Sequence, residues 1–116
     1  MIVRPEICSS ERTADGVRLL LKIPAELSYF EGHFPGCPVL PGVVQLRWAI
    51  ELGHEHVGFA GKFRALAAVK FSRVILPEAL VSLTLEFDRD TRELGFEYVL
   101  NDGQPCSSGT ALFEGC

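Results

Sequence analysis

GHFPGCPVLPGV, at residues 32–43, is the stretch that decides the fold of this chain. Its three prolines and three glycines do not suit a strand, because proline removes a donor from a sheet ladder and glycine weakens a strand interior. Proline is favoured in the first turn of a helix, so Pro41 indicates that a helix begins there. The stretch therefore predicts a shaped loop that leads into a helix.

One helix is expected from about Pro41 to His56. Apolar side chains occupy most positions between Val43 and Leu52, and glycines follow near the expected end. Because these apolar residues fall on nearly every side of the helix, we expect it to be buried on most of them.

Strand patterns surround this helix. Two of them, at residues 81–87 and 94–100, alternate apolar and polar side chains with a period of two. A hairpin signal, Asn101-Asp102-Gly103, follows the second. The expected strands cover residues 2–9, 17–23, 65–75, 81–87, 94–100 and 106–113. The pattern predicts an α+β fold in which two strands precede the helix and an antiparallel meander follows and wraps it.

Length and composition favour one domain over residues 1–116, with 47% hydrophobic and 22% charged residues. The densest apolar stretches are interrupted by charge or proline, which argues against a membrane span. No secretory signal is visible at the start, so a cytoplasmic location is expected. A net charge of −4 without a basic run argues against nucleic-acid binding, which needs clustered Lys and Arg.

The four cysteines argue against a zinc site and against a dithiol redox motif, because none of them form a pair at CxxC spacing. They are Cys8, Cys37, Cys106 and Cys116. Free thiols are expected, and no metal, nucleotide or flavin is implied as a cofactor.

The loop contains one candidate base. His33 lies between Gly32 and Phe34, where a partly desolvated imidazole could remove a proton near neutral pH. The helix start at Pro41-Gly42 then offers unpaired N–H groups and a positive dipole end to a developing oxyanion. This order of groups suits a thioester substrate. On spacing alone, a hydrogen-bonded structural histidine is the commoner role, and a glycine after proline is usually part of a turn.

Residues 32–43 closely resemble the GHFPxxPxxPGV signature of the β-hydroxyacyl-acyl-carrier-protein dehydratases, the hot-dog enzymes of fatty-acid synthesis. VKFSRVILP, at residues 69–77, resembles the family's second recognisable stretch, a strand with KF before an aliphatic run and a proline. The continuation PGVVQLRWA, at residues 41–49, looks most like dehydratase-like proteins of aryl-polyene-type lipid clusters. The resemblance implies a hot-dog fold: a curled antiparallel sheet of five or six strands wrapped around one long helix.

The resemblance also implies roles for particular residues. His33 matches the family's catalytic histidine, which removes the C2 proton of a 3-hydroxyacyl thioester. Gly42 matches the glycine whose backbone N–H polarises the thioester carbonyl. Substrate contacts are expected from the neighbouring Phe34, Pro41 and Val43, and from Glu51 on the helix.

The implied partner is a pantetheine-bearing carrier, either acyl carrier protein or coenzyme A. Acyl carrier protein is acidic, so a small basic docking rim is expected. Its candidate residues are Lys62, Arg64, Lys70 and Arg73. The family also implies a homodimer or larger homo-oligomer with composite sites, in keeping with an apolar helix that one curled sheet leaves partly uncovered.

The sequence departs from the family at one catalytic position. The family's acidic residue, fourteen places after the histidine and contributed by the other protomer, is here Arg47. A guanidinium does not lose its proton in a protein, so it cannot replace a carboxyl that cycles between acid and base.

Three interpretations of Arg47 stay open. It could hydrogen-bond the substrate hydroxyl or a water while His33 alone shuttles the proton. It could hold a carboxylate on an unusual substrate. It could pair with Glu51, one helical turn on, in a domain that binds acyl thioesters without turning them over. Because some hot-dog thioesterases carry a catalytic glutamate on this helix, hydrolysis that uses Glu51 is the main enzymatic alternative to dehydration.

Overall fold

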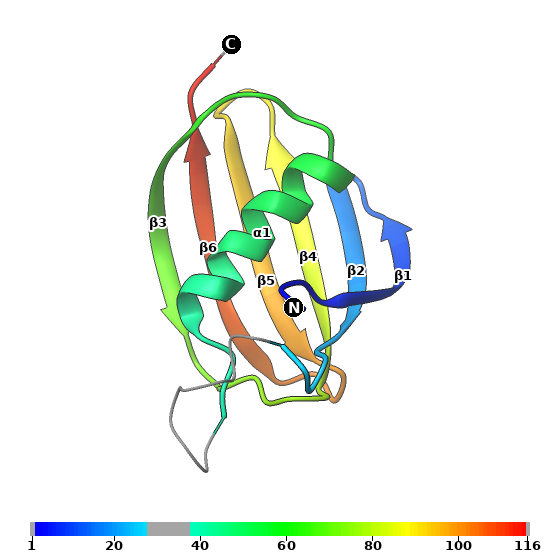
Figure 1. Cartoon of the computed structure of the whole chain (residues 1–116). Coiled ribbons are helices and arrows are strands. Elements are labelled where there is room, and N and C mark those ends of the chain that lie inside the picture. Colours follow the sequence, from blue (N-terminus) through cyan, green and yellow to red (C-terminus); the bar gives the residue numbers. More distant parts are fainter. Residues whose placement is uncertain (1, 28–37, 116) are drawn as a thin grey trace.

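The structure, a computed structural model, describes residues 2–27 and 38–115. In these residues one helix lies across one face of a curled antiparallel sheet of six strands (Figure 1). The elements are β1 (Glu6–Arg12), β2 (Gly16–Lys22), α1 (Gly42–His56), β3 (Phe63–Phe71), β4 (Leu80–Asp88), β5 (Glu93–Leu100) and β6 (Pro105–Phe113). The expected α+β architecture is confirmed. Among the same residues, no helix is long and apolar enough to cross a membrane.

The strand order across the sheet is β1-β2-β4-β5-β6-β3, and all neighbouring strands are antiparallel. β4, β5 and β6 form the expected meander with short turns. β3 follows the helix directly in the chain, yet it pairs with β6 and forms one edge of the sheet. The expectation of a single meander after the helix is therefore wrong for β3.

The expected strand over residues 65–75 ends early, at Phe71, because the chain then leaves the pairing with β6 and contacts the segment before the helix. The main-chain N–H groups of Ser72 and Arg73 both donate to the carbonyl of Cys106, at 2.7 and 3.2 Å, where regular pairing stops. Ile75 is completely buried, and its carbonyl accepts a hydrogen bond from the N–H of Leu40 at 2.8 Å. This apolar run thus supplies a strand and then a mostly exposed connection that is anchored by the buried Ile75.

The strand expected over residues 2–9 begins and ends later in the sequence, as β1 at Glu6–Arg12. The reason is that the residues before β1 lie against α1. The indole N–H of Trp48 donates to the carbonyl of Val3 at 3.1 Å. Arg4 donates two hydrogen bonds to Glu55, at 2.9 and 3.1 Å, and they hold the pKa of that carboxyl below its usual range. The first residues therefore secure the helix instead of extending the sheet.

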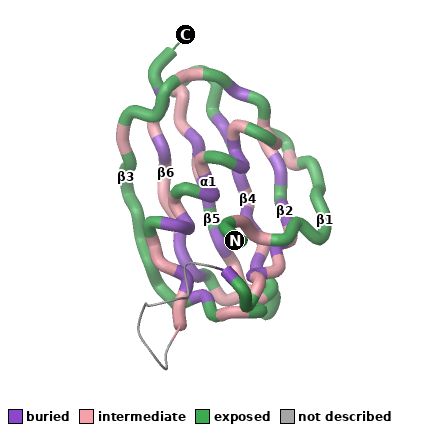
Figure 2. Tube along the Cα trace, in the orientation of Figure 1, coloured by how far each residue is buried: buried purple, intermediate pink, exposed green. Residues whose placement is uncertain are grey.

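The core lies between α1 and the inner face of the sheet. Trp48, Ala49 and Leu52 of the helix are completely buried. Figure 2 shows the buried positions alternating with more exposed ones along the central strands. The buried strand residues include Val17, Leu19, Leu21, Val81, Leu83, Leu85, Phe87, Leu94, Phe96 and Tyr98. Each large apolar side chain buried in this way contributes about 1.5–3 kcal/mol to folding.

α1 is buried or half-buried on most sides, as expected, and it is exposed along one outer stripe. On the buried side, a Cβ on Gly53 would lie 2.8 Å from Cδ2 of Leu94, so glycine permits the close approach of the helix to β5. The exposed residues are spaced four apart along the helix: Val43, Arg47, Glu51 and Glu55.

Candidate active site

Two of the predicted site residues, His33 and Phe34, lie outside the described residues. Their roles as base and substrate contact stay predictions. The described chain resumes at Pro38 and leads directly into the helix, so the remaining candidates can be located from that point.

Leu40 fixes the path of the chain into the helix. It is 3% exposed, and its N–H donates to the carbonyl of Ile75 at 2.8 Å. Its own carbonyl accepts a hydrogen bond from the side-chain amide of Gln45 at 3.2 Å. Both backbone polar groups of Leu40 are therefore satisfied, as burial requires.

The helix start is an uncapped N-terminus. Pro41, the N-cap residue, has extended backbone angles and no side-chain oxygen, and the first turn contains no acidic residue. Its carbonyl accepts hydrogen bonds from the N–H groups of Val44 and Gln45 at 3.1 and 3.2 Å. The N–H groups of Gly42 and Val43 have no acceptor within the helix, by helix geometry. The positive end of the helix can therefore act on a developing negative charge.

Gly42 is also the point at which the edge strand meets the helix. A Cβ on Gly42 would lie 2.7 Å from Cζ and 2.9 Å from Cε1 of Phe71, at the end of β3. Glycine therefore lets this aromatic ring pack directly against the helix start. Phe71 is nevertheless half exposed, so the ring also borders the surface.

The predicted residues further along α1 are not gathered at its start. Arg47 and Glu51 lie on the outer stripe, with side chains 61% and 45% exposed. Their nearest charged atoms, Nε and Oε2, are 4.0 Å apart. By a rise of about 1.5 Å per residue, Arg47 lies about 7.5 Å along the axis from Gly42, and Glu51 about 6 Å further. Among the predicted residues that the structure describes, those brought together within one chain are Pro41, Gly42 and Val43.

The family model named ApeI-like, which is described as ApeI dehydratase, matches residues 9–110. The chain belongs to the ApeI-like dehydratase family. The resemblance to dehydratases of aryl-polyene-type clusters is thus confirmed at the level of family.

Curated relatives of this ApeI-like chain are named 3-hydroxyacyl-[acyl-carrier-protein] dehydratase FabZ. The protein from Chloroflexus aggregans is 32% identical over 80 residues, which cover 63% of this chain and 56% of the relative. The protein from Oenococcus oeni is 33% identical over 94 residues, which cover 73% of this chain and 68% of the relative. The matched regions thus span 56% and 68% of the lengths of these two relatives.

Solved structures confirm the hot-dog fold of the ApeI-like chain. The dehydratase heterocomplex ApeI:P from Xenorhabdus doucetiae matches with a TM-score of 0.87 and 28% identity, over 94% of this chain and 96% of the other. An uncharacterized protein from Erwinia carotovora subsp. atroseptica matches with a TM-score of 0.86 and 28% identity, over 96% of each chain. A hypothetical thioesterase with coenzyme A from Streptococcus pneumoniae, at 12% identity and a TM-score of 0.62, shows the shared fold alone.

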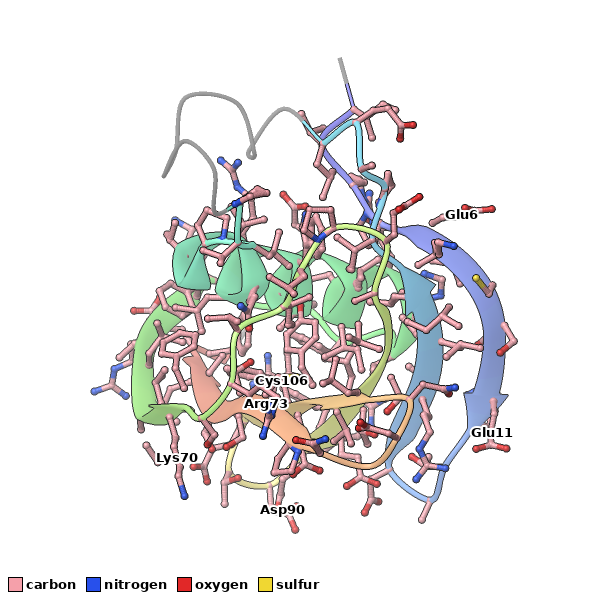
Figure 3. All side chains as sticks on the ribbon, turned by 90° about the horizontal axis from the view of Figure 1, so that it is seen from below. Glu6, Glu11, Lys70, Arg73, Asp90 and Cys106 are labelled. Atoms are coloured by element: carbon pink, nitrogen blue, oxygen red, sulfur yellow. The ribbon has the colours of Figure 1, made fainter. Side chains whose placement is uncertain are left out.

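The predicted basic rim of the ApeI-like chain is divided into two pairs. All four residues are exposed, but Lys62 and Arg64 lie at the start of β3, whereas Lys70 and Arg73 lie at its end. Lys62 and Lys70 are eight positions apart along the chain, which in an extended strand corresponds to roughly 25 Å. Only the second pair lies near the helix start, because β3 ends at Phe71 beside Gly42. In Figure 3, Lys70 lies on the side of the sheet away from α1, and Arg73 lies near Cys106.

Two cysteines are described, and both carry free thiols. Cys8 is exposed, whereas Cys106 is buried, and burial raises the pKa of the Cys106 thiol. Cys37 and Cys116 lie outside the described residues. In the described part of the chain, no three His, Cys, Asp or Glu side chains are grouped to hold a metal ion.

Sequence reasoning missed the polar residues that support the helix start. Gln45 is 3% exposed and Ser107 is equally buried, and their side chains are hydrogen-bonded at 2.6 Å. Tyr98 is completely buried, which raises its pKa well above the usual range and keeps its hydroxyl protonated. That hydroxyl donates to the main-chain carbonyl of Gln45 at 2.7 Å. The signal in the sequence that could have indicated them is Gln45, a single amide side chain among apolar residues on the helix.

The contact between Gly42 and Phe71 gives a prediction for stability. In the native background, Gly42→Ala should destabilise the fold, because the new methyl group displaces the ring of Phe71. In a Phe71→Ala background the same change should be neutral or stabilising by up to about 1 kcal/mol, because alanine restricts the unfolded chain. Urea unfolding of the four proteins should give a coupling of about 1 kcal/mol. If the two substitutions change the free energy of unfolding additively, the ring of Phe71 moves aside without destabilising the fold.

Proposed function

We propose that this chain is a (3R)-hydroxyacyl-thioester dehydratase-like protein that acts on acyl-carrier-protein or coenzyme A thioesters in fatty-acid or related lipid biosynthesis. Arg47 replaces the usual acidic residue. The observation that carries the proposal is the uncapped helix start at Gly42, seven positions after the end of the GHFP stretch at residues 32–35, in an ApeI-like chain. The names of the FabZ relatives support the same reaction class.

The proposed reaction assigns one step to each group. His33 takes the C2 proton of the 3-hydroxyacyl thioester, and the N–H of Gly42 stabilises the negative charge that develops on the thioester oxygen. The C3–O bond then breaks, the C2–C3 double bond forms, and the proton held by His33 leaves with the hydroxyl as water. Arg47, whose guanidinium stays protonated, can donate a hydrogen bond to the departing oxygen. Phe34, Pro41 and Val43 contact the substrate at the loop and helix start.

The Arg47–Glu51 contact supports a second candidate function. Two oppositely charged side chains one turn apart, both exposed, form the kind of pair that stabilises a helix surface without any part in chemistry. The domain would then bind acyl thioesters without turning them over. Glu51 supplies a carboxylate on the helix, where some hot-dog thioesterases carry a catalytic glutamate. Thioester hydrolysis is therefore the enzymatic alternative.

One pair of assays tests these candidates. A 3-hydroxyacyl thioester of pantetheine or acyl carrier protein is added, and enoyl-thioester absorbance and free thiol are followed together. Absorbance without thiol release supports the dehydratase, and thiol release supports the thioesterase. Neither signal, together with measurable ligand binding, supports the binding protein.

The proposed partner is an acidic acyl carrier protein or coenzyme A in the cytoplasm. Lys70 and Arg73 are exposed near the helix start, where a carrier must deliver its pantetheine arm. Opposite charges on carrier and enzyme would speed their encounter and would be screened by salt.

We expect a homodimer or a larger homo-oligomer. β3 is an edge strand with unpaired main-chain groups, and it also presents exposed apolar side chains, an arrangement that invites a second chain. Those side chains are Phe63, Leu66, Val69 and Phe71. Light scattering at micromolar concentration should give at least twice the mass of one chain. A clean monomer would count against the composite site.

A further inference from the structure

Gln45 forms a clamp on the two peptide groups that precede the helix. Its side-chain nitrogen donates to the carbonyl of Leu40 at 3.2 Å, and its main-chain N–H donates to the carbonyl of Pro41 at 3.2 Å. One residue therefore holds two successive carbonyls. Gln45 is 3% exposed, so water does not compete for these bonds.

The side-chain contacts determine the orientation of the Gln45 amide. The carbonyl of Leu40 can only accept a hydrogen bond, so the NH₂ group must face it. The amide oxygen then faces Ser107, whose hydroxyl donates to it at 2.6 Å. Ser107 thus holds the amide in the orientation that binds Leu40.

The clamp fixes the direction of the Gly42 N–H through peptide planarity. The carbonyl of Pro41 and the N–H of Gly42 belong to one planar peptide group, so holding the carbonyl orients the N–H. The carbonyl of Leu40 belongs to the preceding plane, and the ring of Pro41 restricts the rotation between the two planes. With both carbonyls held, little freedom remains for the Gly42 N–H.

The sheet supplies a rigid base for the clamp. Ser107 on β6 is in register with Tyr98 on β5 and with Phe71 on β3. These three side chains reach the first helical turn from adjacent strands: Ser107 and Tyr98 bind Gln45, and Phe71 packs against Gly42. Three neighbouring strands therefore contact the first helical turn, and of these three side chains only that of Ser107 binds the side-chain amide of Gln45.

We propose that Gln45, oriented by Ser107, is a positioning residue that aims the Gly42 N–H at the carbonyl of the bound thioester. This inference rests on the proposed function, because it assigns the Gly42 N–H its role. Gln45 itself does not touch the substrate; its side chain acts through the carbonyl of Leu40, while the carbonyl of Pro41 is held by main-chain N–H groups. Losing the clamp should therefore lower kcat far more than it raises KM.

The test replaces the clamp without leaving a buried polar side chain unpaired. In Gln45→Met/Ser107→Ala, both side chains become apolar at similar volume. The variant removes the bond to the carbonyl of Leu40, which then lacks this partner, and leaves the main-chain bond from residue 45 to Pro41 in place. Tyr98→Phe is the matched control, since it removes a buried hydrogen bond to Gln45 but none to Leu40. Each protein is assayed with a 3-hydroxyacyl pantetheine thioester at a temperature at which all are folded.

The double variant should lose between about 10-fold and 10²-fold in kcat, with KM within about threefold, because small misplacements of reacting groups have effects of this size. Tyr98→Phe should stay within about threefold of the native kcat. Equal losses in both proteins, or an unchanged kcat in the double variant, would overturn the proposal.

Amide hydrogen exchange separates this inference from the proposed function. If the native protein turns over no hydroxyacyl thioester, the proposed function fails, but the clamp can still be observed. The Leu40 amide, bound to the carbonyl of Ile75, should exchange at least about tenfold faster in the double variant, relative to the amide of Leu83 on β4. It should be unchanged in Tyr98→Phe. Unchanged exchange in the double variant would show that Gln45 does not hold this segment.

Discussion

Replacing His33 with alanine should abolish turnover, with a loss of about 10²–10⁴-fold, the contribution of a positioned general base. The stability of the fold should change by less than about 0.5 kcal/mol, because the residue is proposed to face a substrate and not the core. Stopped assays of enoyl-thioester formation, together with urea unfolding of the same preparations, measure both quantities.

A second histidine provides the control. His54 lies on the helix, with Nδ1 3.2 Å from the carbonyl of Phe59 and its ring 4.4 Å from that of Phe59 and 5.2 Å from that of Phe113. His54→Ala should therefore destabilise the protein by about 1 kcal/mol and leave turnover nearly native at a temperature where it is folded. If His33→Ala unfolds the chain and His54→Ala does not, His33 is a structural residue.

Local patterns predicted the elements of the fold because each pattern reports the surroundings of its own segment. Val81, Leu83, Leu85 and Phe87 alternate in the sequence, and all four are buried on the inner face of β4. Pro41 marked the helix start within one residue, since its geometry suits a first turn. These features depend on neighbours in the chain, and therefore they can be read from it.

Pairing between distant segments could not be read in this way. β3 lies beside β6, and the chain after it crosses the end of the sheet to reach β4; along this path the hydrogen bond between Leu40 and Ile75 joins residues 35 positions apart. The N-terminal residues look like a strand, yet Val3 binds Trp48 on the helix. In both places, long-range contacts override local propensity.

The candidate site likewise has one part that local sequence predicts and one part that depends on distant residues. Gly42 at an uncapped helix start follows from local sequence, because Pro41 provides neither an N–H nor a side-chain cap. The support from Gln45 and Ser107 depends on two residues 62 positions apart. A buried amide among apolar residues indicates that a partner exists, because buried polar groups are hydrogen-bonded, but it does not say which residue that partner is.

Arg47 is exposed beside Glu51, so its substitution can alter chemistry without disturbing the core. Arg47→Glu restores the acidic group that the dehydratase resemblance calls for at this position. It removes the contact with Glu51 and sets two carboxylates one helical turn apart, at a cost of a few tenths of a kcal/mol. The protein should therefore fold, with a urea midpoint close to that of the native chain.

If the chain is a weakened relative of the dehydratases, the restored carboxyl should raise 3-hydroxyacyl dehydration by about 10²-fold or more, the scale of a positioned general acid. Arg47→Ala is the control, and it should leave the activity low because it supplies no proton donor. If Arg47 instead grips an anionic substrate or orients the departing hydroxyl, both changes should lower activity, and glutamate should be the worse because its charge repels the anion. Unchanged turnover and unchanged ligand binding in both variants would remove Arg47 from the site and leave it as the surface partner of Glu51.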